Sequence, residues 1–144
     1  SKNWKYLEDQ GIITNQEYIN ATFTQHYRTV EEFRAPFDNK DSVISKSGLI
    51  LKSCETMITE CPYKIHYSNN KNTMSPQDYA KTLIPTMRSW SETVFRNALV
   101  DRTDREINEI VDKFYNLYID EVSNDPEGHA MDYVHVIMDI EKAY

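Results

Sequence analysis

Two long helical patterns follow one another between residues 75 and 122, and they limit the fold more than any other feature of the sequence. Ser75 and Pro76 supply a helix cap and a proline at the first helical position. Thr103 to Glu106 has the form of a capping box, in which a threonine and a glutamate three residues apart each accept a hydrogen bond from the other's backbone amide. Apolar residues then recur at steps of three or four, the spacing of one helical face. They are Tyr79, Leu83, Met87, Trp90, Val94 and Ala98 in the first pattern, and Ile107, Ile110, Val111, Phe114, Leu117, Tyr118 and Val122 in the second. Pro85 lies inside the first pattern and is expected to kink or divide that helix.

Two shorter helices are predicted ahead of the long ones by the same start signal. Thr14 to Glu17 and Thr29 to Glu32 each place a glutamate three residues after a threonine. The second of these helices is expected to stop at Pro36, because a proline disfavours helical geometry in the residue before it.

Two apolar segments outside the helical patterns are predicted to be β-strands. Leu49 to Thr59 is rich in β-branched and apolar residues and follows Gly48, which is typical of a turn into a strand. Tyr133 to Ile140 is almost continuously apolar, which suits a strand covered on both faces. The predicted fold class is therefore α+β and mostly helical, a single domain over residues 1–144, with residues 48–59 and 133–141 paired as antiparallel strands. A two-stranded ribbon is marginal in water by itself, so the last strand is expected to belong to a larger sheet.

Charge and composition exclude several classes of function. A net charge of −7 without a basic patch argues against binding nucleic acid, which is recognised through clustered Lys and Arg. No apolar run approaches the ~20 residues of a membrane helix, and no signal-peptide pattern is present, so no membrane partner and a cytoplasmic location are expected. In that setting Cys54 and Cys61 are expected to be reduced thiols.

The glycines exclude a familiar kind of cofactor site. The chain has three, Gly11, Gly48 and Gly128, and they lie far apart in sequence. A nucleotide site usually needs closely spaced glycines so that the backbone can approach phosphate or ribose. No cofactor loop is therefore recognisable in this sequence.

Short phrases in the sequence nevertheless resemble a family of enzymes in their order and spacing. The phrases are Gly11–Glu17, Tyr27–Phe33, Gly48–Leu51, Met87–Glu92, Phe114–Tyr118 and Tyr133–Lys142. Together they resemble the C-terminal part of S-adenosylmethionine-dependent methyltransferases of the salicylate, benzoate and theobromine carboxyl methyltransferase group, and the similar juvenile-hormone-acid enzymes. In that fold the last two strands form a hairpin at the edge of an α/β sheet, and a helical cap covers the substrate.

The resemblance implies a fragment of an α/β methyltransferase fold. The cofactor-binding half, with its glycine loop and ribose-gripping acidic residue, has no counterpart here. S-adenosylmethionine is therefore expected in the complete enzyme and not on this chain alone, and no residue of this chain is predicted to be catalytic. Catalysis in such an enzyme consists largely of holding the methyl sulfonium in line with the acceptor.

The resemblance also suggests which residues contact the small-molecule acceptor. Tyr27, Met87, Trp90 and Phe95 are the candidates, because a small-molecule pocket has apolar walls with a few polar groups. The competing interpretation is that these side chains belong to the core, which is the commoner role of aromatic and methionine residues at helical spacing.

Two charged groups have similar alternatives. Arg88 suits a substrate carboxylate, but Glu92 lies one helical turn later and is the favoured partner. His26, beside Tyr27, is the one histidine considered as a base at an acceptor site, and the histidines do not have the spacing of a metal site.

A second hypothesis comes from a different class of function. The chain would be a non-catalytic helical module for self-association or protein interaction, forming a homodimer through edge strands or exchanged helices. An apolar surface of the strand pair that is exposed, or covered only in a dimer, would favour a piece of something larger, and one covered within the monomer would favour a self-sufficient module.

Overall fold

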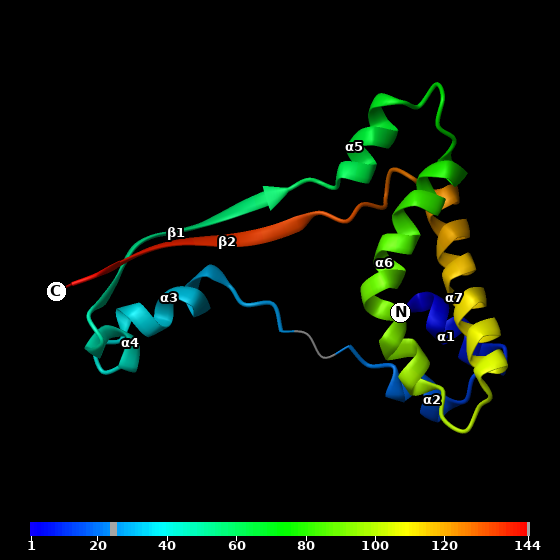
Figure 1. Cartoon of the computed structure of the whole chain (residues 1–144), viewed down its shortest axis with the longest axis horizontal. Coiled ribbons are helices and arrows are strands. Elements are labelled where there is room, and N and C mark those ends of the chain that lie inside the picture. The colour runs from blue at the N-terminus through cyan, green and yellow to red at the C-terminus, as the bar shows by residue number, and fades with distance from the viewer. Residues whose placement is uncertain (24–25, 144) are drawn as a thin grey trace. The chain divides into compact units, whose positions relative to one another are not determined.

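The structure is a computed structural model that describes residues 1–23 and 26–143, in which helices and one antiparallel strand pair alternate along the chain (Figure 1). The elements are α1 (Lys2–Asp9), α2 (Asn15–Asn20), α3 (Val30–Asp38), α4 (Val43–Lys46), β1 (Leu49–Thr59), α5 (Pro62–Asn69), α6 (Pro76–Ala98), α7 (Asp104–Asn124) and β2 (Tyr133–Lys142). The described residues divide into two compact units. We call residues 1–23 and 61–131 the helical unit, and residues 26–60 and 132–143 the hairpin unit.

The starts of α2, α3, α6 and α7 are those predicted from the sequence. Thr14, Thr29 and Thr103 each form a complete capping box, and Ser75 forms one with Asp78. Helix α6 continues through Pro85 as one element, so this proline does not divide it. The prediction that α3 stops at Pro36 is wrong. This proline removes one amide donor from the last turns, but the amide of Asn39 still donates to the carbonyl oxygen of Ala35, so the helix closes beyond it.

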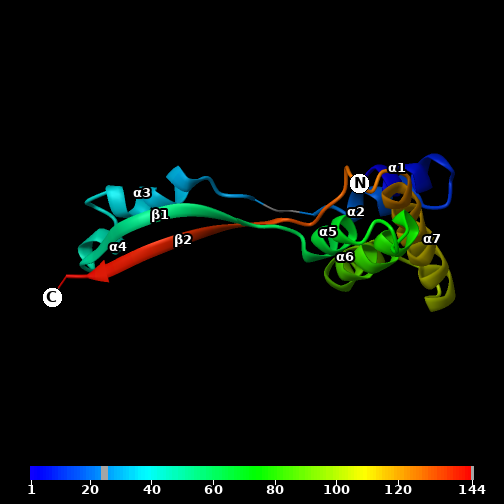
Figure 2. The same cartoon turned by 90° about the horizontal axis from the view of Figure 1, so that it is seen from above.

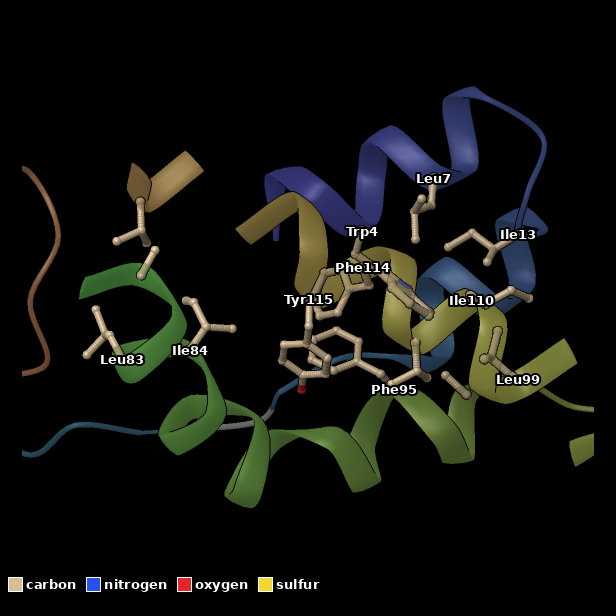
Figure 3. Packing of buried hydrophobic residues seen from close by; sticks show 14 of the residues in the cluster. Trp4, Leu7, Ile13, Leu83, Ile84, Phe95, Leu99, Ile110, Phe114 and Tyr115 are labelled. Carbon is tan, nitrogen blue, oxygen red and sulfur yellow. The ribbon is translucent and has the colours of Figure 1, made fainter. Parts of the chain in front are cut away.

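An aromatic core holds the helical unit together (Figure 3). Trp4 and Leu7 of α1 are buried, and the ring of Trp4 lies 4.9 Å from Phe95 of α6 and 5.1 Å from Phe114 of α7. The rings of Phe95 and Phe114 are 4.2 Å apart. The apolar faces predicted for the two long helices, α6 and α7, thus pack against each other, and α1 packs on α7. Burial of these rings provides the main stabilisation of the unit.

A buried ion pair fixes α2 against the segment before α7. Glu17 is 3% exposed, and its carboxylate accepts hydrogen bonds from Arg102 Nε at 2.6 Å and from a terminal nitrogen of the same guanidinium at 2.7 Å. Arg102 also donates to the carbonyl oxygen of Ile12. Because the guanidinium matches the carboxylate at two points, the geometry is of the kind that keeps a buried charge tolerable.

The loop after α7 is tied by two lysines to α5 and to the turn that follows it. Lys64 and Lys71 contact the carboxylate of Glu127 at 2.8 and 2.6 Å, and Lys64 also donates to the carbonyl oxygen of Pro126. Below them Tyr67 stacks on Tyr79 with ring centroids 4.8 Å apart. These bonds order the chain just before it leaves the helical unit for β2.

The strand pair of the hairpin unit matches the prediction closely. Residues 49–59 pair antiparallel with residues 133–142 (Figure 2). The ladder contains a bulge between Leu51 and Ser53. Gly48, with φ of +78°, turns the chain into β1, and its carbonyl oxygen accepts a hydrogen bond from the amide of Ala143. A side chain at this glycine would be strained by that φ and would meet the Ala143 oxygen at 3.2 Å.

The two faces of the hairpin differ in what covers them. Alternation along the strands places Cys54, Thr56, Val134, Val136 and Met138 on one face, which α3 overlies. The other face carries Met57, Glu55, Tyr133, His135 and Ile137 and stays open. Apolar side chains of the hairpin that are at least 43% exposed are Ile50, Met57, Ile58, Tyr133, Val134, Ile137 and Ile140.

Candidate functional site

A hollow in the hairpin unit lies between the start of α3 and the hairpin. It is an open groove of about 770 Å³. One wall is the extended segment of residues 26–29 with Val30 and Phe33 of α3, and the floor is formed by the hairpin. The floor residues are Thr56, Val134 and Val136. Because β2 alternates, both valines face the same side, and the groove floor is apolar.

A helix cap fixes the polar rim of this groove. The carboxylate of Glu32 accepts a hydrogen bond from the backbone amide of Thr29 at 2.7 Å, and its other oxygen lies 3.0 Å from Nε2 of His26. The backbone amide of Thr29 and then His26 hold the pKa of Glu32 below its usual range, so this carboxylate is ionised near neutral pH. The cap therefore holds the His26 ring at the entrance of the groove.

A cation and a phenol extend this rim. The guanidinium carbon of Arg28 lies 6.0 Å from the centre of the Phe33 ring, at the outer limit of a cation–π contact. Tyr27 lines the groove and is 84% exposed. An apolar floor with a guanidinium, an imidazole and a phenol at the rim suits a small molecule with an apolar body and one polar or anionic end. These groups can bind and orient such a molecule, and none of them is arranged as a covalent nucleophile with its base.

The four residues predicted to contact an acceptor lie in different environments. Tyr27 lines the groove in the hairpin unit, whereas Met87, Trp90 and Phe95 belong to α6 of the helical unit. Trp90 is 52% exposed, and its ring lies 6.2 Å from that of Phe23.

Phe95 and Met87 have more interior positions. Phe95 is 5% exposed and contacts the rings of Trp4 and Phe114, so its side chain is part of the core. Met87 packs against the same core, and its carbonyl oxygen accepts a hydrogen bond from the hydroxyl of Ser91. The structure thus brings Trp90 and Phe95 to a common neighbour, because Phe23 also lies 5.5 Å from Phe95.

Arg88 has the partner that the helix spacing favours. Its Nε lies 2.5 Å from the carboxylate of Glu92, and a terminal nitrogen lies 2.7 Å from Asp112 of α7. Its guanidinium also lies 5.1 Å from the centre of the Tyr115 ring. These contacts occupy the guanidinium with intramolecular partners.

Metal-binding side chains do not cluster in the described part of the chain. Within residues 1–23 and 26–143, no group of three or more His, Cys, Asp or Glu side chains is placed to hold an ion. Cys54 is half-buried, Cys61 is buried, and both are thiols, as predicted. No helix in these residues has the length and apolar character needed to cross a bilayer.

Several groove residues were not singled out from the sequence. Arg28 and Phe33 occur in a phrase that the resemblance quoted, but nothing in their spacing indicated a shared wall. Val134 and Val136 are two apart in a strand, and that period alone predicts a common face. The turn through α4 decides which face of the hairpin α3 covers. The sequence did not predict this turn.

No protein-family model matches the sequence, and a search of curated proteins finds no match either.

Proposed function

We propose that this chain is the acceptor-binding C-terminal portion of an S-adenosylmethionine-dependent small-molecule methyltransferase, inactive by itself. The observation that carries the proposal is the long antiparallel hairpin of β1 and β2, which encloses the helices α5, α6 and α7 in sequence and leaves apolar side chains exposed. This order, a strand, a helical insertion and a final strand, is that of the C-terminal part of the family the sequence resembles.

The exposed side chains favour this proposal over a self-sufficient module. Tyr133, Ile137 and Met57 lie on the open face of the hairpin and are between 46% and 50% exposed. A single strand pair that buries little on this face is marginal in water, so its apolar residues suit a sheet with further strands or a covering layer. The methyltransferase hypothesis supplies such strands in the cofactor-binding half.

The groove supplies an acceptor site on this proposal. Val134, Val136 and Phe33 form the apolar surface, and Tyr27 with Arg28 provides the polar contacts that orient the acceptor. A carboxylate acceptor suits the guanidinium best, since Arg offers two parallel donors to a carboxylate. The acceptor site on α6 that includes Met87, Trp90 and Phe95 stays a prediction of the resemblance.

The experiment uses the complete coding sequence in which residues 1–144 occur. We expect it to encode a glycine-rich cofactor loop upstream of Ser1, and its product to bind S-adenosylhomocysteine in a calorimetric titration. That product should transfer a tritiated methyl group from S-adenosylmethionine to a carboxylate among benzoate, salicylate and longer aliphatic acids. Residues 1–144 alone should bind no S-adenosylhomocysteine.

A variant pair tests the assignment of the groove. Tyr27→Ala in the longer protein should raise KM for the acceptor at least several-fold and leave the affinity for S-adenosylhomocysteine unchanged. Tyr6→Ala, an exposed tyrosine of α1, is the control and should change neither value. Micromolar binding of S-adenosylhomocysteine by residues 1–144, or a coding sequence without a cofactor loop, would contradict the proposal.

A further inference from the structure

The outer edge of β2 is the least protected backbone in the hairpin. Among the described residues the sheet contains only β1 and β2, so β2 has a strand partner on one side. The row of amide and carbonyl groups on its other side is a template for a further strand. The outer edge of β1 is better protected, because the strand carries the bulge next to Lys52, and α3 and α4 pack against it. Bulges and lysines are two common ways in which proteins block edge pairing.

The sequence of β2 is complementary to itself when it is run antiparallel. If a two-fold axis passes at Ile137, the two copies of Ile137 face each other. A residue that precedes Ile137 by some number of positions then faces the partner residue that follows Ile137 by the same number. The facing pairs are His135 with Asp139, Val134 with Ile140, Val136 with Met138, and Tyr133 with Glu141. The imidazole faces a carboxylate, and aliphatic side chains face aliphatic or thioether side chains.

The neighbouring registers match less well, although an axis at Met138 also places His135 against Glu141 and Val136 against Ile140. An axis at Met138 places Ile137 against Asp139 and Val134 against Lys142, and an axis at Val136 places Asp139 against Tyr133. A two-fold axis perpendicular to the sheet leaves corresponding faces of the two hairpins on the same side of the joint sheet. Facing residues must therefore point to the same face, so the possible registers differ in steps of two residues. Charge and apolar pairing therefore select the axis at Ile137.

We propose that this chain forms a homodimer in which the β2 strands of two copies pair antiparallel about Ile137, joining the two hairpins into one four-stranded sheet. The exposed fractions of Val134, Ile137 and Ile140 are 67%, 50% and 43%, and each would face an apolar side chain of the partner strand. Such an interface is isologous and closes at two copies. The dimer is a proposal about residues 1–144 by themselves, and it goes beyond the proposed function, because it rests on the edge of β2 and not on an acceptor or a cofactor. A longer chain that supplies its own strand to β2 would compete for the same edge.

Disulfide trapping tests the axis directly. Ile137→Cys places two thiols opposite each other across the two-fold axis, where directly paired residues have Cβ atoms within about 4.5–5.5 Å. Mild oxidation should convert most of this variant to a covalent dimer, and mass spectrometry should identify a disulfide that joins two copies of the peptide carrying this substitution. Ile58→Cys is the control, since Ile58 is 63% exposed but lies on β1. Both sites are on the surface, so neither substitution threatens the fold.

A charge exchange tests the register. His135→Asp should weaken the dimer roughly 10- to 30-fold, because each of the two symmetric facing pairs becomes two carboxylates. Asp139→His alone should not reproduce wild-type affinity, and the double variant H135D/D139H should restore the dimer by exchanging the partners in the same register. Dissociation constants come from sedimentation equilibrium, with circular dichroism as the check on folding.

Two results would overturn the inference. One is a wild-type chain that stays monomeric in sedimentation at about 100 μM, a concentration at which even a weak specific dimer is populated, since this would mean that the edge waits for a strand of a longer chain. The other is covalent dimer formation by the Ile58→Cys variant to the same extent as by the Ile137→Cys variant, since that would place the contact elsewhere.

Discussion

Loss of the Arg102 guanidinium should destabilise the helical unit more than loss of any exposed arginine. Arg102 donates two hydrogen bonds to Glu17, whose carboxylate is 3% exposed and has the backbone amide of Thr14 as its other donor. In Arg102→Met the methionine keeps much of the apolar stem, but the carboxylate stays buried without its counter-charge. Breaking one side of a buried ion pair costs about 3–5 kcal/mol, and we expect the lower end because Arg102 itself is 22% exposed.

Arg105→Met is the matched control. Arg105 lies three residues later, and its Nε is 3.9 Å from Glu109 in a pair whose side chains are 84% and 67% exposed. Exposed pairs of this kind contribute about 0–1 kcal/mol, so this variant should be nearly as stable as the wild type. Both variants lose one positive charge and gain the same side chain, so the comparison isolates burial.

The pH dependence of the difference adds a second readout. Burial raises the pKa of Glu17, but the hydrogen bonds from Arg102 and Thr14 outweigh it, so the folded-state pKa lies below the ordinary 4.5. The stabilisation by this pair is therefore fully present above about pH 4.5 and is lost as the pH falls through the lower folded value. In Arg102→Met the guanidinium no longer opposes the effect of burial, which raises the pKa of Glu17. The carboxylate can then take up a proton at pH 4, which removes the cost of burying its unpaired charge. The difference in free energy of unfolding between Arg102→Met and the wild type should therefore be smaller at pH 4 than at pH 7.

Urea unfolding followed by tryptophan fluorescence measures these differences, because Trp4 is 1% exposed in the core of the helical unit. A difference between Arg102→Met and Arg105→Met of less than about 1 kcal/mol at pH 7, the upper limit for an exposed pair, would refute the role of burial. A difference in free energy of unfolding between Arg102→Met and the wild type that is equal at pH 7 and pH 4 would also refute the role of burial.

Three further changes have expected outcomes. Phe114→Ala, at a fully buried ring, should lower the free energy of unfolding by about 3–5 kcal/mol in the same urea titration, and a loss below about 1 kcal/mol would mean that the core is not closed around it. Thr29→Ala removes the side-chain cap of α3 and should cost that helix about 1 kcal/mol, seen as faster amide hydrogen exchange in α3; unchanged exchange would argue against the capping box. Hydrogen bonds from Lys64 and then Lys71 lower the pKa of Glu127 to about 2 from 4.5, so its stabilisation is present above pH 4.5 and is lost as the pH falls to about 2. Glu127→Gln should therefore flatten the acid-unfolding curve of the helical unit over that range, and a curve of unchanged slope would contradict the role of the two lysines.

Much of the fold was predictable because its signals are local. A capping box involves residues three apart, so the starts of α2, α3, α6 and α7 followed from the sequence. The strand pair followed from two apolar segments of similar length, and the bounds of both strands agree with the predicted ones within a residue or two. The expected stop at Pro36 was wrong because α3 is exposed and tolerates one missing amide donor.

Helices α1 and α5 were not predicted, for a physical reason. Helix α1 buries Trp4 and Leu7 against residues of α6 and α7, and two apolar residues are too few to define a helical period. Helix α5 begins at Pro62, in a stretch interpreted as the break after β1. Glu127 forms ion pairs with Lys64 of this helix and with Lys71 in the turn after it. Short helices of this kind derive their stability from tertiary contacts.

The candidate site shows the same division. Tyr27 was named from the sequence and lines the groove, but the other walls come from α3 and β2, which are about a hundred residues apart along the chain. Phe95 and Trp90 both belong to the broad apolar pattern of α6, yet one is 5% exposed and the other 52%. Five residues turn an α-helix by about 140°, so the two side chains point in different directions, and only the packing of α1 and α7 decides which of them is buried.

The sequence by itself determined where α2, α3, α6 and α7 begin, which two segments are strands, and which faces of the two long helices are apolar, because these depend on hydrogen bonds and periodicities within a few residues. Only the tertiary structure decided which side chains close the core, which line the groove, and which ion pairs are buried. Glu17 and Arg102 are 85 residues apart in sequence, and their contact depends on the path of the whole chain between them. The open edge of β2 is likewise a property of the assembled sheet, since a strand's sequence does not say how many neighbours it has.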